Sequence, residues 1–146
     1  MEKYIGVKII EAKPMLLIDA EELLGRKIKA GNEEGYLVKY NDGYESWSPK
    51  YQFEEAYRKI DNMTFGLAIE AAKKGHKIAR VGWNGKGMFV YYVPENYYET
   101  QTDVAKKELG ELAKYNPYLA IKNVNGTIST WVPSINDVLS EDWIIV

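Results

Sequence analysis

Short runs in the first part of the chain alternate apolar and polar residues, as half-buried strands do. The stretch "KYIGVKIIEAKPM" alternates up to Pro14, which we expect to end a strand. The stretch "AEELLGRKIKAGNEEG" predicts a short polar helix or a loop. Residues 36–47 alternate again on both sides of Asn41-Asp42-Gly43, which favour the positive φ angles of a tight turn and predict a hairpin.

A helix is expected directly after this hairpin. Ser48 and Pro49 suit its N-cap and its first position. The apolar stripe of this helix consists of Phe53, Ala56, Tyr57 and Ile60. Together these patterns predict a small β-hairpin and helix module over residues 1–60.

A second module, residues 61–146, opens with another helix pattern. Thr64 suits its N-cap and Gly75 suits the position just after its end. The inward positions of this helix are Phe65, Ala68, Ile69 and Ala72. Strands are expected over 76–83 and 88–93, with "NGKG" turning the chain between them.

The remainder predicts further strands around a polar insertion. The insertion, 94–118, contains a surface helix pattern over 102–115. Asn125-Gly126 marks a hairpin, and a capped helical turn, "SINDVL", precedes a final strand over 141–146. The fold class expected is α+β, with a helix packed on an antiparallel β-sheet.

Composition excludes several classes of protein. The 46% apolar content is that of a globular chain, and no apolar run is long enough to span a membrane. The absence of cysteine excludes disulfides and cysteine-based zinc sites, and a cytoplasmic location is expected by default. A net charge of −2 disfavours binding to duplex nucleic acid. Twelve Tyr and four Trp beside three Phe suit partly exposed ligand or subunit surfaces as well as a core.

The loop "GWNGKGM" resembles a phosphate loop but does not satisfy its pattern. Arg80 stands where the first glycine of a P-loop belongs, and a strand follows where a helix is required. The loop is either a plain turn or a ligand-binding loop. In the second case Trp83 and Met88 offer apolar contacts, Asn84 offers hydrogen bonds and Lys86 offers charge to a phosphate.

A second cluster of candidates lies in "TWVPSINDVLSEDW". Trp131 ends a strand, and Ser134 opens a helical turn whose free N–H groups suit an anion. Asp137 and Asp142 are acceptors suited to a ribose or an exocyclic amine. The structural alternatives are N-capping by Ser134, complementation of the helix dipole by Asp137 and a solvated face at Asp142.

Catalytic chemistry is hardly represented in the sequence. His76 is the only histidine, and its place after Gly75 suits a surface position. No serine has the spacing of a nucleophile elbow, and no calcium-loop pattern occurs. We expect no enzyme, no metal and no cofactor.

The order and spacing of "ARVGWNGKGM" and "TWVPSINDVLSEDW" resemble those of a family of small phage proteins, the Thoeris anti-defence sponges of the second type. The resemblance covers residues 62–146. It implies a non-catalytic homodimer or homotetramer, located in the cytoplasm of the infected bacterium. It also implies that this protein sequesters a cyclic nucleotide messenger, a cyclic ADP-ribose isomer or a cyclic dinucleotide, so that an immune effector is not activated.

The resemblance also implies a pocket between subunits. Its walls are expected to be Trp83, Met88 and Trp131. Asn84, Ser134, Asp137 and Asp142 occupy the polar positions of the same motifs. Candidates for holding the diphosphate are Lys86, Arg80 and the Ser134 turn.

Three other functions remain open from the sequence. The first is a phage or prophage interaction protein whose aromatic surfaces serve assembly alone. It would be favoured if Trp83 and Trp131 were buried in the core of one subunit. The second is a single-stranded nucleic-acid binder that uses tyrosine-rich strands for stacking. The third is a nucleotide-cleaving enzyme. No role is expected in advance for residues 1–60, which resemble a small domain found in phage and prophage proteins.

Overall fold

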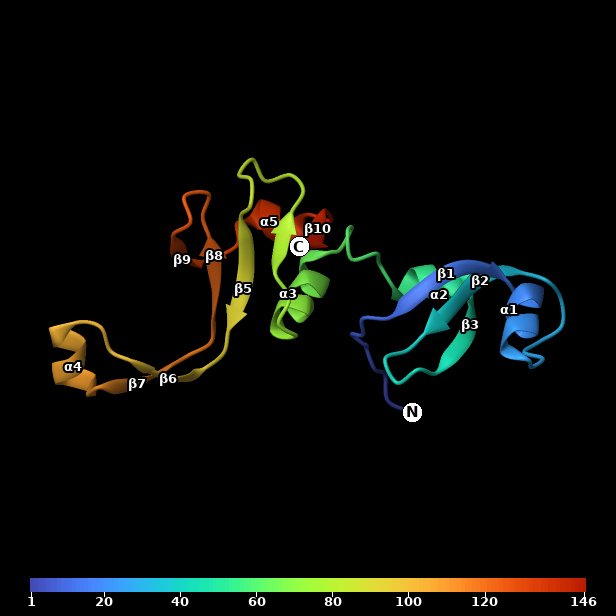
Figure 1. Cartoon of the computed structure of the whole chain (residues 1–146), viewed down its shortest axis with the longest axis horizontal. Coiled ribbons are helices and arrows are strands. Elements are labelled where there is room, and N and C mark those ends of the chain that lie inside the picture. The colour runs from blue at the N-terminus through green and yellow to red at the C-terminus, as the bar shows by residue number, and fades with distance from the viewer. The chain divides into compact units, whose positions relative to one another are not determined.

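The computed structural model describes residues 1–146 and divides them into two compact units, Met1–Arg58 and Lys59–Val146 (Figure 1). None of the five helices is long and apolar enough to cross a membrane.

The N-terminal unit is a three-stranded antiparallel sheet with two short helices. Its elements are β1 (Glu11–Leu16), α1 (Leu17–Leu24), β2 (Glu34–Lys39), β3 (Glu45–Pro49) and α2 (Lys50–Ala56). The strand order is β1-β2-β3. Leu17, Ala20 and Trp47 form its core, and the Trp47 indole N–H donates to the carbonyl of Met15 over 2.9 Å.

The first predicted strand is shifted along the chain. It begins at Glu11 and includes Pro14, whereas residues 4–10 have no strand partner. Pro14 lies opposite Tyr36 on an edge strand, where its missing N–H breaks no ladder if it points away from β2. Apolar alternation alone therefore did not make a strand, because a strand also needs a neighbour with which to pair.

The turn and helix that follow also differ in detail from the predictions. Within Asn41-Asp42-Gly43 only Gly43 has a positive φ, of 86°. Ser48 remains in β3, so the residue that precedes α2 is Pro49, which makes no side-chain cap. The helix ends at Ala56, which leaves Ile60 exposed rather than on the apolar stripe.

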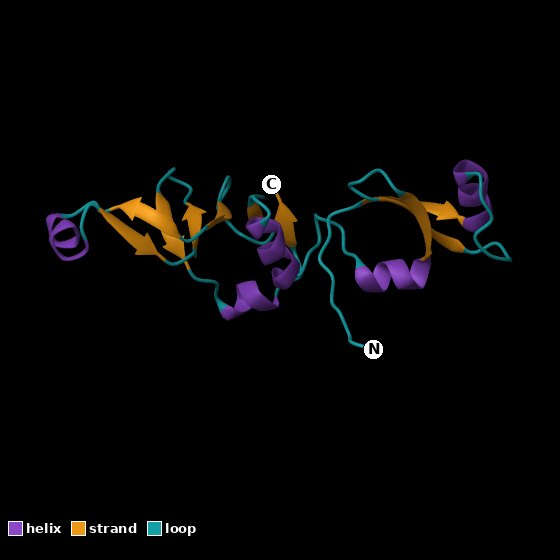
Figure 2. Cartoon of the chain, turned by 90° about the horizontal axis from the view of Figure 1, so that it is seen from below, coloured by secondary structure: helices purple, strands orange, loops and turns teal.

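The C-terminal unit confirms the predicted α+β fold. Its helices are α3 (Phe65–Lys73), α4 (Asp103–Leu109) and α5 (Ile135–Leu139). Its strands are β4 (Ile78–Arg80), β5 (Phe89–Val93), β6 (Asn96–Glu99), β7 (Leu112–Tyr115), β8 (Tyr118–Lys122), β9 (Ile128–Trp131) and β10 (Trp143–Ile145). Five of the strands form an antiparallel sheet in the order β10-β4-β5-β8-β9, and α3 packs on one face of it (Figure 2).

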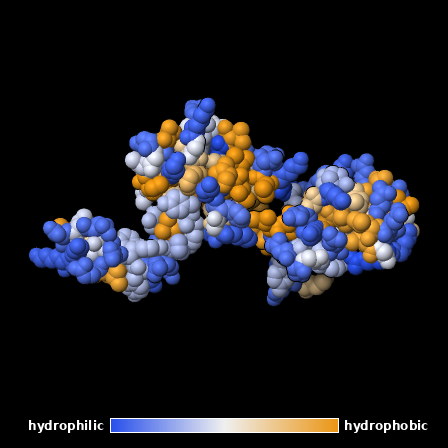
Figure 3. All heavy atoms as spheres, viewed as in Figure 1, coloured by the Kyte–Doolittle hydropathy of each residue, from blue (hydrophilic) through white to orange (hydrophobic).

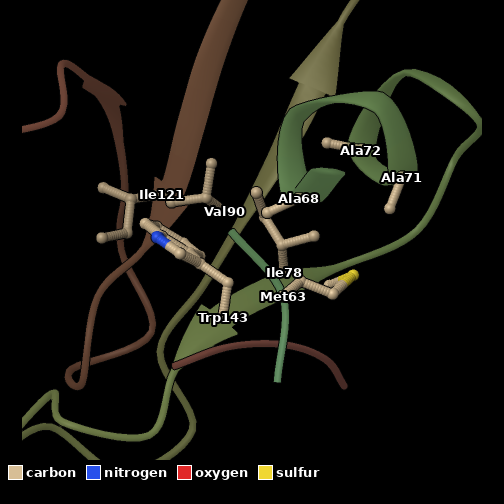
Figure 4. Packing of buried hydrophobic residues seen from close by; sticks show 8 residues of the cluster. All are labelled: Met63, Ala68, Ala71, Ala72, Ile78, Val90, Ile121 and Trp143. Carbon is tan, nitrogen blue, oxygen red and sulfur yellow. The ribbon is translucent and has the colours of Figure 1, made fainter. Parts of the chain in front are cut away.

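The core of this unit lies between α3 and the sheet (Figure 4). Small residues on α3 allow the helix to approach closely, and Trp143 fills the space beneath it. The buried residues are Met63, Ala68, Ala71, Ala72, Ile78, Val90, Ile121 and Trp143. The predicted cap is confirmed, since the Thr64 hydroxyl accepts a hydrogen bond from the N–H of Leu67.

The insertion after β5 is an arm rather than a single helix. It contains the two-stranded sheet β6-β7 with α4 between the strands, and it extends away from the five-stranded sheet (Figure 1). The predicted helix over 102–115 ends at Leu109, because Gly110 takes a φ of 86°. Residues 112–115 pair with β6 instead of continuing the helix.

Candidate functional site

The loop between β4 and β5 depends on its glycines for structural reasons. A side chain at Gly85 would overlap the Met88 sulfur and the side chain of Val124. Gly87 has a φ of 73°, which disfavours other residues. Within this loop Asn84 and Lys86 are exposed and Met88 is half-buried. The glycines are therefore explained by the loop's own packing, and the exposed polar side chains remain available to a ligand.

Three tryptophans from distant segments meet beside this loop. The ring centroid of Trp83 lies 6.0 Å from that of Trp131 and 5.4 Å from that of Trp143, in edge-to-face geometry. Trp131 and Trp143 are 6.1 Å apart, and Phe65 packs against both. Trp143 is fully buried, whereas Trp83 and Trp131 are half-buried. The cluster thus has a rigid interior and leaves part of two indole rings open to solvent.

Asp137 holds two of these tryptophans in place. Its Oδ1 accepts from the indole N–H of Trp83 at 3.1 Å and from Arg80 Nη1 at 2.9 Å. Its Oδ2 accepts from the backbone N–H and the hydroxyl of Ser134, at 3.0 and 2.8 Å. The carbonyl of Asp137 accepts from the indole N–H of Trp143 at 2.8 Å. Since both indole N–H groups are bonded inside the protein, only the ring surfaces of Trp83 are free for a ligand.

Asp142 fixes the start of the β4–β5 loop through hydrogen bonds to Arg80 and Gly82. One of its oxygens accepts from Arg80 Nε at 2.8 Å, and the other accepts from the backbone N–H of Gly82 at 2.8 Å. The Arg80 guanidinium therefore lies between two carboxylates, and the three side chains carry a net charge of −1. The hydrogen bonds that Arg80 donates, first to Asp142 and then to Asp137, raise the pKa of Arg80.

The Asp137 carboxyl is strongly acidic in the folded protein. Burial opposes its ionisation, but hydrogen bonds from Trp83, Arg80 and Ser134 outweigh burial and lower its pKa from 3.8 to about 2. Its side chain is 13% exposed, so solvent screens these bonds only weakly.

This shift predicts a loss of stability in acid. Because the pKa is lower in the folded state, the stabilisation is complete above the unfolded pKa of 3.8 and disappears as the pH falls towards 2. Asp137 alone should make the free energy of unfolding about 2 kcal/mol smaller at pH 2 than at pH 6. Urea unfolding at several pH values, followed through the indole N–H resonance of Trp83, measures this. An unchanged acid dependence in Asp137→Asn would contradict the assignment.

The structure brings all nine predicted site residues together, in two groups. Trp83, Asn84, Lys86, Met88 and Trp131 present side chains on or beside the loop and the tryptophan cluster. The second group, which already has internal partners, consists of Arg80, Ser134, Asp137 and Asp142.

The internal partners change the electrostatics expected of the site. Ser134 and Asp137 form a capping box, so the N–H of Ser134 is occupied by a carboxylate instead of an anionic ligand. Arg80 is already neutralised by two carboxylates. Lys86 is the candidate cation without an ion-pair partner. Lys122, which the sequence did not single out, places its Nζ 3.3 Å from the carbonyl of Gly87 and supplies a second cation at the loop.

No group of three or more His, Cys, Asp and Glu side chains is arranged to hold a metal ion. The site is a set of aromatic rings, two lysines and an amide, which suits recognition of a planar and anionic molecule.

The C-terminal unit is a small α+β domain in which a helix packs on an antiparallel sheet. Its tryptophan cluster lies beside a glycine-rich loop and forms an aromatic site at the surface. Residues 63–146 match the family described as Tad2-like, the Thoeris anti-defense 2-like domain. The chain belongs to this family and has an anti-defence role.

A relative supports the same assignment. "Thoeris anti-defense 2" of Bacillus phage SP01 is 37% identical to this chain over 84 residues, which are 58% of this chain and 94% of the relative. The N-terminal unit lies outside the residues that match the family.

Proposed function

We propose that this protein binds and sequesters a cyclic nucleotide messenger of bacterial immunity, without catalysis, and so blocks activation of the effector. The expected ligands are cyclic ADP-ribose isomers and, as a second class, cyclic dinucleotides. The observation that carries the proposal is the pair of half-exposed tryptophans, Trp83 and Trp131, in a chain of the anti-defence family. The indole N–H of Trp83 is held by Asp137.

The parts of the site suit the parts of such a ligand. A base stacked on an indole face gains about 1–3 kcal/mol. Because Asp137 fixes the plane of Trp83 in advance, little side-chain entropy is lost on binding. Lys86 and Lys122 supply charge for a diphosphate, and Asn84 can both donate to and accept from a base edge.

The aromatic surface is open on one chain, which supports a pocket completed by a second subunit. Ile135 and Leu139, four residues apart on α5, are 68% and 74% exposed and lie on the same helix as Asp137. Hydrophobic atoms lie uncovered on the surface of the C-terminal unit (Figure 3). An exposed apolar surface beside a ligand site is typical of a subunit interface.

The second face of the five-stranded sheet offers another contact between subunits. Val90 of β5 points into the core, so Phe89, Tyr91 and Val93 point to the face that carries no helix (Figure 2). Tyr118 lies opposite Val93 on that face. A solvated face normally carries polar residues, so these positions favour a homodimer, or a homotetramer that uses both surfaces.

Calorimetric titration of the full chain with cyclic ADP-ribose isomers and a panel of cyclic dinucleotides tests this function. We expect tight binding of one class, from a protein that sediments as a dimer or tetramer in the same buffer. The ligand should be recovered intact after the protein is denatured.

Each alternative outcome has a clear meaning. If a well-folded oligomer binds nothing in the panel, the sponge function fails and a role in assembly alone takes its place. Burial of Trp83 and Trp131 in the core of one subunit would have favoured that role, and both rings are half-exposed instead. Recovery of a cleaved ligand would show an enzyme instead.

A further inference from the structure

The N-terminal unit contains a hollow of about 590 Å³, a volume within the range of ligand sites. It lies where β1 and β2 meet the start of α2, with one residue of α1 at its rim. It belongs to the part of the chain outside the family match, so the anti-defence domain does not account for it.

The hollow has an apolar floor because α2 covers only part of the sheet. The helix packs on β2 and β3, where Tyr36 stacks on Phe53 with ring centroids 4.1 Å apart. Pro14 lies opposite Tyr36 on β1, and Leu16 follows two residues later on the same face. Leu16 is 40% exposed. The floor can therefore bury an aliphatic or planar group of a ligand.

The charged groups around this floor are mainly acidic. Glu34 pairs with Lys50 at 3.0 Å, and Glu54 accepts a hydrogen bond from the Tyr36 hydroxyl at 2.9 Å. Asp19 has no hydrogen-bond or ion-pair partner on its side chain, and Glu54 has no cationic one. Three carboxylates and one ammonium give the hollow a formal charge of −2. This negative charge favours a cationic ligand.

The edge of the sheet limits how a partner can approach. β1 is an edge strand, but Pro14 interrupts its row of N–H donors. A strand added to this edge would lack a hydrogen bond there. Recognition by an inserted side chain is therefore favoured over recognition by strand addition.

We propose that this hollow binds an arginine side chain of a partner polypeptide. The aliphatic stem lies on Pro14 and Leu16, and the planar guanidinium, which is more weakly hydrated than an ammonium, bonds to the carboxylate of Glu54. The N-terminal unit is thus a docking module for a basic and apolar segment. This site is independent of nucleotide binding by the C-terminal unit.

The test uses the full chain labelled with ¹⁵N and the peptide acetyl-Ala-Leu-Arg-Leu-Ala-amide. Saturable shifts are expected for the amides of the residues that line the hollow. The same peptide with citrulline, a neutral isostere of arginine, should bind at least about tenfold more weakly. Glu54→Gln should weaken binding by a similar factor, whereas Glu55→Gln, the neighbouring carboxylate outside the hollow, should leave it unchanged.

Several results would overturn the proposal. They are the absence of saturable shifts at millimolar peptide, equal binding of the citrulline peptide, and an equal effect of Glu55→Gln. If spermidine binds as tightly as the peptide, the ligand is a small amine and docking of a polypeptide is excluded. Glu54 is exposed and its amide analogue can still accept from Tyr36, so the variant should fold, which its spectrum checks directly.

Discussion

Asp137→Ala is expected to lower the free energy of unfolding of the C-terminal unit by about 3 kcal/mol. The substitution removes the acceptor of four hydrogen bonds at once, from Arg80, Trp83 and twice from Ser134. It leaves the Trp83 indole N–H without its partner inside a half-buried cluster. Arg80 keeps one carboxylate, Asp142, which is why the loss is not larger.

Urea unfolding of the full chain, followed through the indole resonances of Trp83 and Trp143, measures this loss. Ser134→Ala is the matched control, because it removes only the cap and should cost about 1 kcal/mol. Equal losses in the two variants would mean that Asp137 acts as a helix cap and not as the brace of the tryptophan cluster.

Trp83→Ala should weaken binding of the proposed nucleotide ligand by about tenfold to a hundredfold. Loss of one stacking surface costs about 1–3 kcal/mol, and each factor of ten corresponds to about 1.4 kcal/mol. The side chain is half-buried at the edge of the cluster, while the core residue Trp143 remains in place. The fold should therefore survive the change well enough for calorimetry.

Tyr97→Ala provides the control for this measurement. Tyr97 is a largely exposed aromatic residue on β6 of the arm, away from the tryptophan cluster. Its removal should leave the affinity unchanged. If Trp83→Ala binds as tightly as the unmodified protein, the tryptophan cluster is structural and the ligand contacts another surface.

Features that depend on neighbours in the sequence were predictable. Thr64 caps α3 as expected, and Gly75 follows that helix with a φ of 95°. The hairpin at Asn125-Gly126 joins β8 and β9, and Ser134 caps α5. In each case the deciding interaction lies within a few residues, so a short pattern carries enough information.

Features that depend on distant partners were not predictable in this way. Asp137 was expected to contact a ligand or to complement the dipole of a helix, but its carboxylate also pairs with Arg80, 57 residues earlier. Trp143 looked like one residue of a final strand, and only the tertiary structure makes it the centre of the core. The hydrophobic periodicity of a single segment carries no information about contacts with residues so far away in the sequence.

The arm shows a different limit of local reasoning. The segment 102–115 is rich in helix-forming residues, and that composition outweighed Gly110 in the prediction. The glycine nevertheless ends the helix, and the next residues find β6 as a partner. Gly110, a glycine within a helical pattern, was the signal in the sequence that the helix ends there.

The contacts within the tryptophan cluster limit when this surface can form during synthesis of the chain. Trp83 leaves the ribosome well before Asp137 and Trp143, which fix its plane and support its ring. The β5–β8 hairpin and its arm can form in the interval, but the aromatic surface cannot. Until Trp143 has emerged and β10 has paired with β4, the growing chain carries an unbraced indole and an unpaired Arg80. The anti-defence domain therefore cannot complete its candidate binding surface until the last strand of the sheet is in place.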